Sequence, residues 1–198
     1  MNYLSNKEAY LRAFTFFQEN HAMNPMFGIG AKIKPMESEL YVNKAITVGG
    51  GKLPLLIGST DNEIGVTNFD GNKLEEGRAF AIDGIAVNLT VSDASTKPYN
   101  VDFTKTLTGP QLAAFQFANL NLSQKNERLI SLPISAILNG QEGSYKKYRE
   151  LALTLLKPKD KVEIEIEFPD GVTPAALEDG KSIFVSVVFR GYETFQKR

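Results

Sequence analysis

The sequence predicts an all-β fold in which two antiparallel sheets pack face to face, preceded by a short N-terminal helix and an arm. The first observation is the run 162–168, where apolar side chains alternate with Glu163, Glu165 and Glu167. Side chains alternate across a strand, so one face of this run must meet a core while the carboxylates face water. The second is the apolar run 183–189, which must be covered on both faces. The third is a series of strand-like segments without the alternating helices of a βαβ fold.

The size and composition of the chain fit a single folded domain. With 198 residues, 42% of them hydrophobic, the chain can bury a substantial core. We expect residues 1–37 to form the helix and arm and residues 38–198 to form one sandwich domain. Basic and acidic residues nearly balance, with a formal net charge of -1, so no dedicated nucleic-acid surface is indicated.

Several locations and chemistries do not fit the sequence. It contains no cysteine, which excludes disulfides and thiolate metal sites. Its first residues lack the basic and apolar regions of a secretory signal, so we expect synthesis in the cytoplasm. Because no apolar stretch approaches the roughly 20 residues that cross a bilayer, we expect no transmembrane segment.

Residues 6–19 are predicted to form an amphipathic helix. Ser5 and Glu8 have the spacing of a capping box, and apolar side chains then recur at helical intervals at Tyr10, Leu11, Phe14 and Phe17. The segment 21–35 contains prolines and glycines among scattered apolar residues, which indicates an extended arm. The helix and arm could fold back over their own sandwich or reach a neighbouring subunit, and the sequence leaves both possibilities open.

The β-strands are predicted to begin at about Glu39. Apolar residues from Leu40 to Val48 predict a strand that ends in the glycines 49–51. The segment 53–57 predicts a short strand at a sheet edge, because it contains Pro54. The stretch 59–77 is rich in Asp, Asn and Gly and should be a long loop with a tight turn at 70–72.

The next predicted strand contains a change of phase. Phe80 and Ile82 share one parity, whereas the apolar residues from Ile85 to Val91 share the other. One extra residue beside a permissive glycine is typical of a β-bulge, so we predict a bulge at Asp83-Gly84 that bends the strand.

The second half of the chain predicts further strands and one ambiguous segment. Val101 and Phe103 alternate weakly, and the segment 111–117 suits either a helical turn or a strand. Strands are predicted at 120–122, at 130–134 and from 150 to 156, and the last should form a hairpin with the 162–168 strand through the turn 158–160. The total of about eight to ten strands favours a jelly-roll-like sandwich or barrel.

The glycine-rich segment and the single histidine have simple structural explanations. Lys52 follows three glycines, but Leu53 and Pro54 replace the hydroxyl residue and the helix of a phosphate loop, so we expect a turn. His21 lies at the end of the predicted helix, where it interacts favourably with the helix dipole. A zinc site would need an unusual carboxylate-only ligand set, and we expect none.

The acidic residues also lack the arrangement of a catalytic or calcium site. The glutamates of the 162–168 strand stand in one row, which suits a solvated face or, as a less favoured alternative, a face met by basic residues of another subunit. The oxygen-bearing residues of the loop miss the spacing of a calcium loop, and turn formation explains Asp61, Asn62, Asp70 and Asn72. We therefore expect no catalytic residue, no cofactor and no metal.

Three segments combine long strands with characteristic turns: Leu74 to Ile85, which enters a long strand, and the closing segments Leu155 to Ile166 and Ile183 to Thr194. In these segments the chain resembles the jelly-roll capsid and capsid-associated proteins of bacteriophages. The resemblance lies in the pattern of strands and turns and in the ending Gly191-Tyr192-Glu193. It implies one barrel with an N-terminal arm, a place in the virion, and non-catalytic assembly through contacts with further copies and with other virion proteins.

Two hypotheses about function follow, with an enzyme as a third. The first is a virion structural subunit that forms homo-oligomers through the apolar helix and arm, with contacts at Phe14, Phe17, Met23, Met26 and Phe27. The second is a carbohydrate-binding or lectin-like module whose rim would contain Tyr145, Tyr148 and the loop 61–72, although the sequence contains no tryptophan for sugar stacking. An enzyme would have to act with carboxylates, tyrosines and lysines alone.

Overall fold

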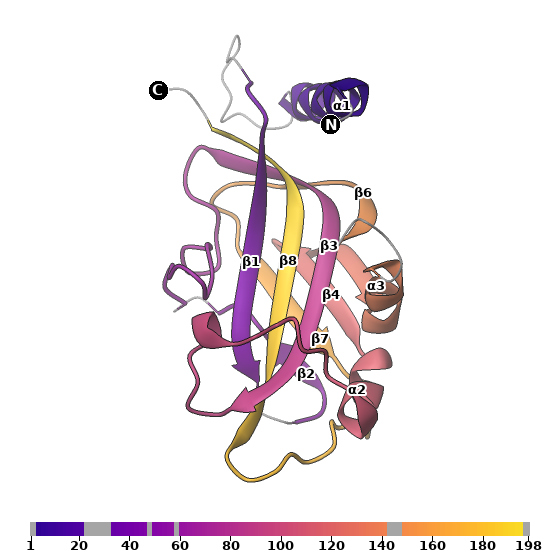
Figure 1. Cartoon of the computed structure of the whole chain (residues 1–198). Coiled ribbons are helices and arrows are strands. Elements are labelled where there is room, and N and C mark those ends of the chain that lie inside the picture. The colour runs from indigo at the N-terminus through magenta and orange to yellow at the C-terminus, as the bar shows by residue number, and fades with distance from the viewer. Residues whose placement is uncertain (1–2, 22–32, 47–48, 58–59, 142–147, 196–198) are drawn as a thin grey trace.

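The computed structural model describes residues 3–21, 33–46, 49–57, 60–141 and 148–195, and it contains two packed antiparallel sheets (Figure 1). Sheet A has the strand order β1 (Met36–Ile46), β8 (Lys181–Phe195), β3 (Arg78–Asp93), β6 (Arg149–Leu156). Sheet B has the order β2 (Lys52–Pro54), β7 (Val162–Glu167), β4 (Asn119–Gln124), β5 (Glu127–Pro133). The prediction of an all-β sandwich with an N-terminal helix is confirmed.

The strands pair in a nested order, the first with the last and each following strand with the one before the last partner. β1 pairs with β8, β2 with β7, β3 with β6 and β4 with β5, and all these pairs are antiparallel. Two further antiparallel pairs, β3 with β8 and β4 with β7, complete the sheets. The first strand of the chain is therefore paired with the last. β8 is one of the two inner strands of sheet A, between β1 and β3.

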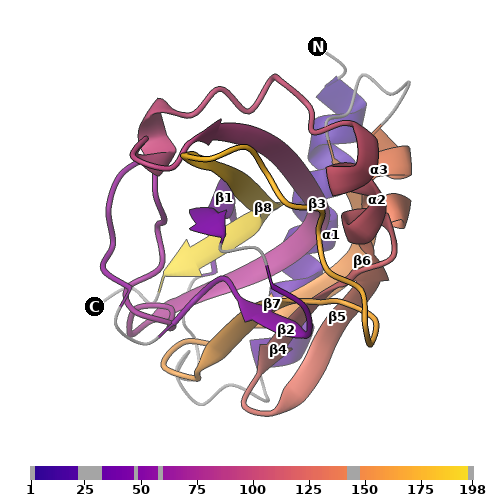
Figure 2. The same cartoon turned by 90° about the horizontal axis from the view of Figure 1, so that it is seen from below.

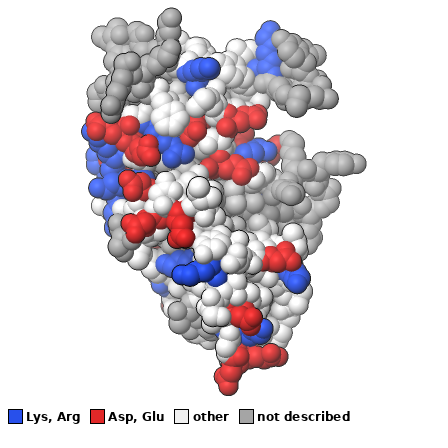
Figure 3. All heavy atoms as spheres, turned by 60° about the vertical axis from the view of Figure 1, so that its left-hand side comes forward, with Lys and Arg blue, Asp and Glu red and all other residues white. Residues whose placement is uncertain are grey.

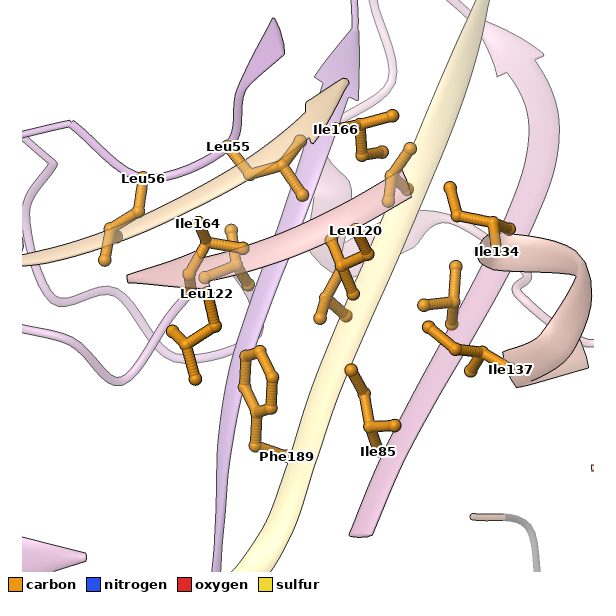
Figure 4. Packing of buried hydrophobic residues seen from close by; sticks show 14 of the residues in the cluster. Leu55, Leu56, Ile85, Leu120, Leu122, Ile134, Ile137, Ile164, Ile166 and Phe189 are labelled. Carbon is orange, nitrogen blue, oxygen red and sulfur yellow. The ribbon is translucent and has the colours of Figure 1, made fainter. Parts of the chain in front are cut away.

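The core lies between the two sheets and is made of aliphatic and aromatic side chains (Figure 4). Leu120 and Leu122 of β4 and Ile164 of β7 face Ile85 of β3 and Phe189 of β8, and all five are buried. The alternation in the 162–168 run thus places its apolar side chains inward, as predicted. Burying a side chain of this size contributes about 1.5–3 kcal/mol, so this layer is the main source of stability.

Two helices close one side of the sandwich beside β3 (Figures 1 and 2). α2 (Gly109–Gln116) includes most of the segment 111–117, which suited either a helix or a strand. Thr108 is its N-cap, and Pro110 lies in the first turn, where the backbone N–H that proline lacks would have no partner within the helix. α3 (Ile134–Gln141) corrects the predicted strand at 130–134, because β5 ends at Pro133 and Ile134 begins a helix. Ile134 and Ile137, three residues apart on one helix face, are both buried in the core.

The predicted hairpin between the 150–156 and 162–168 strands is wrong. β6 belongs to sheet A and β7 to sheet B, so the chain crosses between the sheets after Leu156. The predicted turn is present, with Lys159 at a φ of 63°, but the two strands that it connects do not pair with each other. Gln124 of β4 holds the crossing instead, because its side chain donates to the Lys157 carbonyl at 2.7 Å and accepts from the Lys157 amide at 2.8 Å.

Smaller differences concern the ends of elements. α1 (Tyr3–His21) begins before Ser5, so Ser5 lies inside the helix and is not its N-cap. β2 is shorter than the predicted 53–57 strand, and Val101 and Phe103 lie outside the strands. Val48 falls outside the described residues. The stretch 60–77 is a loop with short β-bridges, including one between Asp70 and Lys73, as predicted.

The predicted bulge is confirmed. Between Ile82 and Gly84 the register of β3 against β8 shifts by one residue, which leaves Asp83 as the extra residue. The pairing of β3 with β6 is irregular at the same place, where residues 151–153 of β6 lie opposite Asp83. Bulges bend a strand, and the end of β3 before the bulge curls over one end of the sandwich, where α1 lies (Figure 1). The helix thus packs on its own sheet, one of the two possibilities that the sequence left open.

The surface on the β1 side carries both signs of charge. Lysines and arginines are mixed with aspartates and glutamates over this face (Figure 3), in keeping with a formal net charge of -1. A long-range field that would steer a polyanion to this face is therefore not expected. Among the helices that the structure describes, none has the length and apolar character needed to cross a membrane.

Candidate functional site: the seat of the N-terminal helix

α1 packs on a small apolar surface at the curled end of sheet A. Ala13 and Phe17 of the helix are 0% and 3% exposed. They contact a surface that we call the helix seat, which consists of Ala79, Ala81, Leu153, Leu155 and Tyr192. The alanines allow the helix to approach the sheet closely, and this cluster is separate from the main core between the sheets.

The bulge places one carboxylate beside the helix seat. The Asp83 side chain is 7% exposed, and its Oδ1 accepts a hydrogen bond of 2.8 Å from Nε of Arg190. Its Oδ2 lies 3.7 Å from Nη2 of Arg12 on α1. A buried charge is costly without partners, so the hydrogen bond from Arg190 stabilises the Asp83 carboxylate. The same carboxylate attracts Arg12 of α1.

Tyr148 extends this group of interactions toward the edge of the sheet. Arg190 Cζ lies 5.3 Å from the centre of the Tyr148 ring, a cation–π contact, and the Tyr148 hydroxyl donates to Oε1 of Glu39 at 2.5 Å. The resulting sequence of contacts, from Glu39 through Tyr148, Arg190 and Asp83 to Arg12, is called the polar chain below. It runs from β1 to Tyr148, which directly precedes β6, and continues through β8 and β3 to α1.

The electrostatic state of the polar chain follows from burial and its neighbours. Burial and the hydrogen bond to Glu39 raise the pKa of Tyr148 to about 12, so its hydroxyl stays protonated at neutral pH. Burial lowers the pKa of Arg190, but the hydrogen bond and charge of Asp83 outweigh it, and the net pKa is raised. Burial also raises the pKa of Tyr192. At neutral pH the Tyr148 hydroxyl can therefore act as a hydrogen-bond donor to Glu39, and the Arg190 guanidinium keeps its charge beside Asp83.

A cleft of about 810 Å³ lies between α1 and the outer face of sheet A. Glu8 and Arg12 of α1, Glu37 of β1 and Glu150 of β6 line it together with Asp83 and Arg190. Within the described part of the chain, no group of three or more His, Cys, Asp or Glu side chains is placed to hold a metal ion. Both oxygens of Asp83 face arginines, one of them Arg12 of α1. This carboxylate is therefore better placed to hold α1 against the sheet than to transfer a proton to a bound molecule.

The residues predicted as subunit contacts fall in different environments. Phe17 is buried in the helix seat, whereas Phe14 is half-buried and stacks on Tyr10, with ring centres 6.4 Å apart. Met23, Met26 and Phe27 lie outside the described residues.

The residues of the alternative ligand rim are only partly described. Tyr145 also lies outside the described residues, and Tyr148 presents one ring face to Arg190. Arg12, Asp83 and Arg190 were not predicted as site residues, and the only sequence signal near them was the change of phase at Asp83-Gly84.

The row of glutamates on β7 meets basic residues of its own chain. Nζ of Lys52 lies 3.4 Å from Glu165 and 3.6 Å from Glu167, and Arg128 lies 3.9 Å from Glu167. Asn121 donates a hydrogen bond of 2.8 Å to Glu167. The carboxylates are thus balanced within the subunit, and the glycines before Lys52 lead into strand β2.

Comparison with known proteins adds no relative: no family model, no curated protein and no solved structure matches this chain. The functional argument therefore depends on the sequence and on the geometry of the fold and the helix seat.

Proposed function

We propose that this protein is a non-catalytic structural subunit of a virion, a jelly roll that assembles with further copies of itself. The observation that carries the proposal is the strand pairing: β1 with β8, β2 with β7, β3 with β6 and β4 with β5. A long antiparallel ribbon rolled across two sheets produces this pairing. Eight-stranded jelly rolls of this kind occur in viral capsid domains, and also in lectins and cupins.

The interior and the polar surface support a structural subunit over a ligand-binding relative of the same architecture. The space between the sheets is filled by buried apolar side chains, and the single histidine of the sequence, His21, is the last residue of α1 and belongs to neither sheet. The outer face of β7 presents glutamates paired with Lys52 and Arg128. Sugar binding would favour exposed aromatic rings there instead.

The N-terminal helix supports contacts between copies. One face of α1 is used in the helix seat, but the neighbouring flank presents Tyr10 at 42% and Leu11 at 49% exposure, with Phe14 between them. We call these three residues the apolar flank. Contiguous apolar surface on a small protein often marks a contact with another molecule, so the apolar flank is proposed to contact a neighbouring subunit.

The test is the state of assembly in solution. Light scattering over a concentration series, with negative-stain images, is expected to show closed oligomers or shells for the full chain. The double variant Tyr10→Ser with Leu11→Ser should remain folded and lose assembly, because the helix seat is untouched. Glu19→Ala, at an exposed residue of α1 outside both the helix seat and the apolar flank, serves as the control and should assemble normally. A full chain that stays monomeric at every concentration would overturn the proposal.

A further inference from the structure

Ile64 is a solvent-exposed residue in a turn beside β1. It is 90% exposed, the highest fraction among the large hydrophobic residues that the structure describes. It lies in a tight turn between Glu63 and Thr67, which form a β-bridge with each other. Single exposed apolar side chains are common on protein surfaces, so a contact at Ile64 is supported by the fixed turn that carries it and by the neighbouring ring of Tyr99.

The turn that carries Ile64 is held firmly on the edge of β1. The Asn43 amide donates to the Val66 carbonyl at 2.7 Å, and the Thr67 hydroxyl donates to the Tyr41 carbonyl at 2.8 Å. The Asn43 side chain donates to the Gly65 carbonyl at 3.0 Å. These bonds pair the turn with the outer edge of β1 at Tyr41 and Asn43 and hold the backbone on either side of Ile64, so little entropy would be lost when Ile64 is buried against a partner.

Gly65 allows a second side chain to support the turn. It has a φ of 82°, and a Cβ built there would lie 2.6 Å from Cβ of Tyr99. Tyr99, which is itself 50% exposed, therefore packs directly against the backbone of the turn. Ile64 with Tyr99 forms a rigid apolar projection, which we call the Ile64 knob.

A small cleft with a mixed apolar and polar lining lies on the other side of the molecule. It has a volume of about 220 Å³ and is formed by β3, α2, α3 and the segment before α2. Its accessible apolar side chains are Phe103, Leu112 and Leu138, above the buried Val87 and Leu89. Among the described residues no charged side chain lines it, and polar side chains complete the lining, as at the rim of many interfaces: Asn88, Thr106, Gln116, Ser135 and Asn139. The volume is below the roughly 300–1,000 Å³ of pockets for small molecules, so a single side chain suits it better.

We propose that the Ile64 knob of one copy inserts into the α2–α3 cleft of a second copy. The knob lies beside β1 and the cleft beside β3 and α3, on opposite sides of sheet A (Figures 1 and 2). A contact between two different surfaces of the same chain is heterologous, and its repetition produces a closed ring or an open filament; a ring is the form that a shell-building unit could use. This inference rests on the proposed function and names its lateral contact.

Cysteine cross-linking can test the contact directly, because the chain contains no cysteine of its own. Ile64→Cys and Asn139→Cys are made as separate proteins, since Asn139 is an exposed residue at the cleft. Mixed under assembly conditions and oxidised, they are expected to give mainly the mixed disulfide dimer, because bridged Cα atoms must lie within about 7 Å. Gln116→Cys provides a second cleft position, and Glu127→Cys, exposed on β5, is the control.

A substitution series gives an independent readout. Ile64→Asp should raise the protein concentration required for assembly by about tenfold or more, because it places a charge at the centre of a buried contact. Ile57→Asp, at a residue that is 44% exposed and outside the turn, should have little effect. Both variants should keep the unfolding midpoint of the parent chain, since neither side chain is buried in the subunit.

The outcomes separate the two proposals. If assemblies form but Ile64→Cys links mainly to itself, or links to the control as well as to the cleft cysteines, the lateral contact is wrong while the structural function stands. Normal assembly of Ile64→Asp would overturn the contact in the same way. If the parent chain remains a monomer under all conditions, both proposals are overturned.

Discussion

Gly191 lies in β8 at a point where the sheet leaves no room for a side chain. A Cβ at this position would lie 2.0 Å from the Ala81 carbonyl oxygen and 2.9 Å from Cε1 of Phe80. Relief would require the central strand of sheet A to move away from β3. We therefore expect Gly191→Ala to lower the free energy of unfolding by about 2–3 kcal/mol, measured by urea denaturation.

The matched control is Gly49→Ala. A Cβ at Gly49 would meet nothing within 4 Å, so its effect should stay within about 0.5 kcal/mol. Equal unfolding midpoints for the two variants would show that β8 and β3 can separate without cost, against the close packing seen at Gly191.

At the scale of single residues, the sequence could indicate a bend but not its partners. The change of phase at Asp83-Gly84 predicted the bulge, because a local parity pattern is enough to detect it. The hydrogen bond from Arg190 to Asp83 spans 107 residues, and no local pattern reports such a distance. Tyr148 was predicted as an exposed ring for the same reason, since its contacts with Glu39 and Arg190 depend on the pairing of β1 with β8.

Among the elements, α1 is the one whose docking can be tested without disturbing the rest. Its buried contacts form a cluster apart from the main core. Phe17→Ala removes the largest side chain that the helix buries in the seat, so α1 should detach while the sandwich stays folded. Limited trypsin digestion at Arg12 should become faster by about tenfold or more.

Phe14→Ala is the control for this prediction, since Phe14 lies on the apolar flank and stacks on Tyr10 instead of packing in the seat. Its digestion rate should match that of the parent chain. If Phe17→Ala lowered the urea midpoint of the sandwich as strongly as it exposed the helix, α1 would be an integral part of the core, contrary to the separate cluster.

The strands show why element prediction succeeded better than pairing prediction. Alternation identified β3, β4, β6 and β7, and a continuous apolar run identified β8, because such patterns are visible in a few residues. The turn at 158–160 could not reveal that β6 and β7 belong to different sheets, since a turn sets the local chain direction and not the next partner. α3 was missed because apolar residues at 130, 132 and 134 continue the strand pattern past Pro133 into the helix.

For the whole molecule, the pairing scheme makes the first half of the chain dependent on the second. β1, β2 and β3 form no ladder with one another, and all their partner strands lie beyond residue 148. The second half is different, because β4 pairs with both β5 and β7. Folding must therefore close long loops before most of the apolar surface is covered, which is typical of slowly folding β-sandwiches.

This scheme predicts how fragments behave. The fragment 36–116 contains three strands without a mutual ladder, so it is expected to show no cooperative urea transition and no β-type far-UV circular dichroism. The fragment 117–195 can form the β4, β5 and β7 part of sheet B, but it lacks β3 to cover that layer and should be weakly ordered. Mixing the two should restore a cooperative transition, because every missing partner is then supplied. A cooperative transition in the isolated fragment 36–116 would contradict the pairing of early with late strands, and with it the jelly-roll assignment on which the proposed function depends.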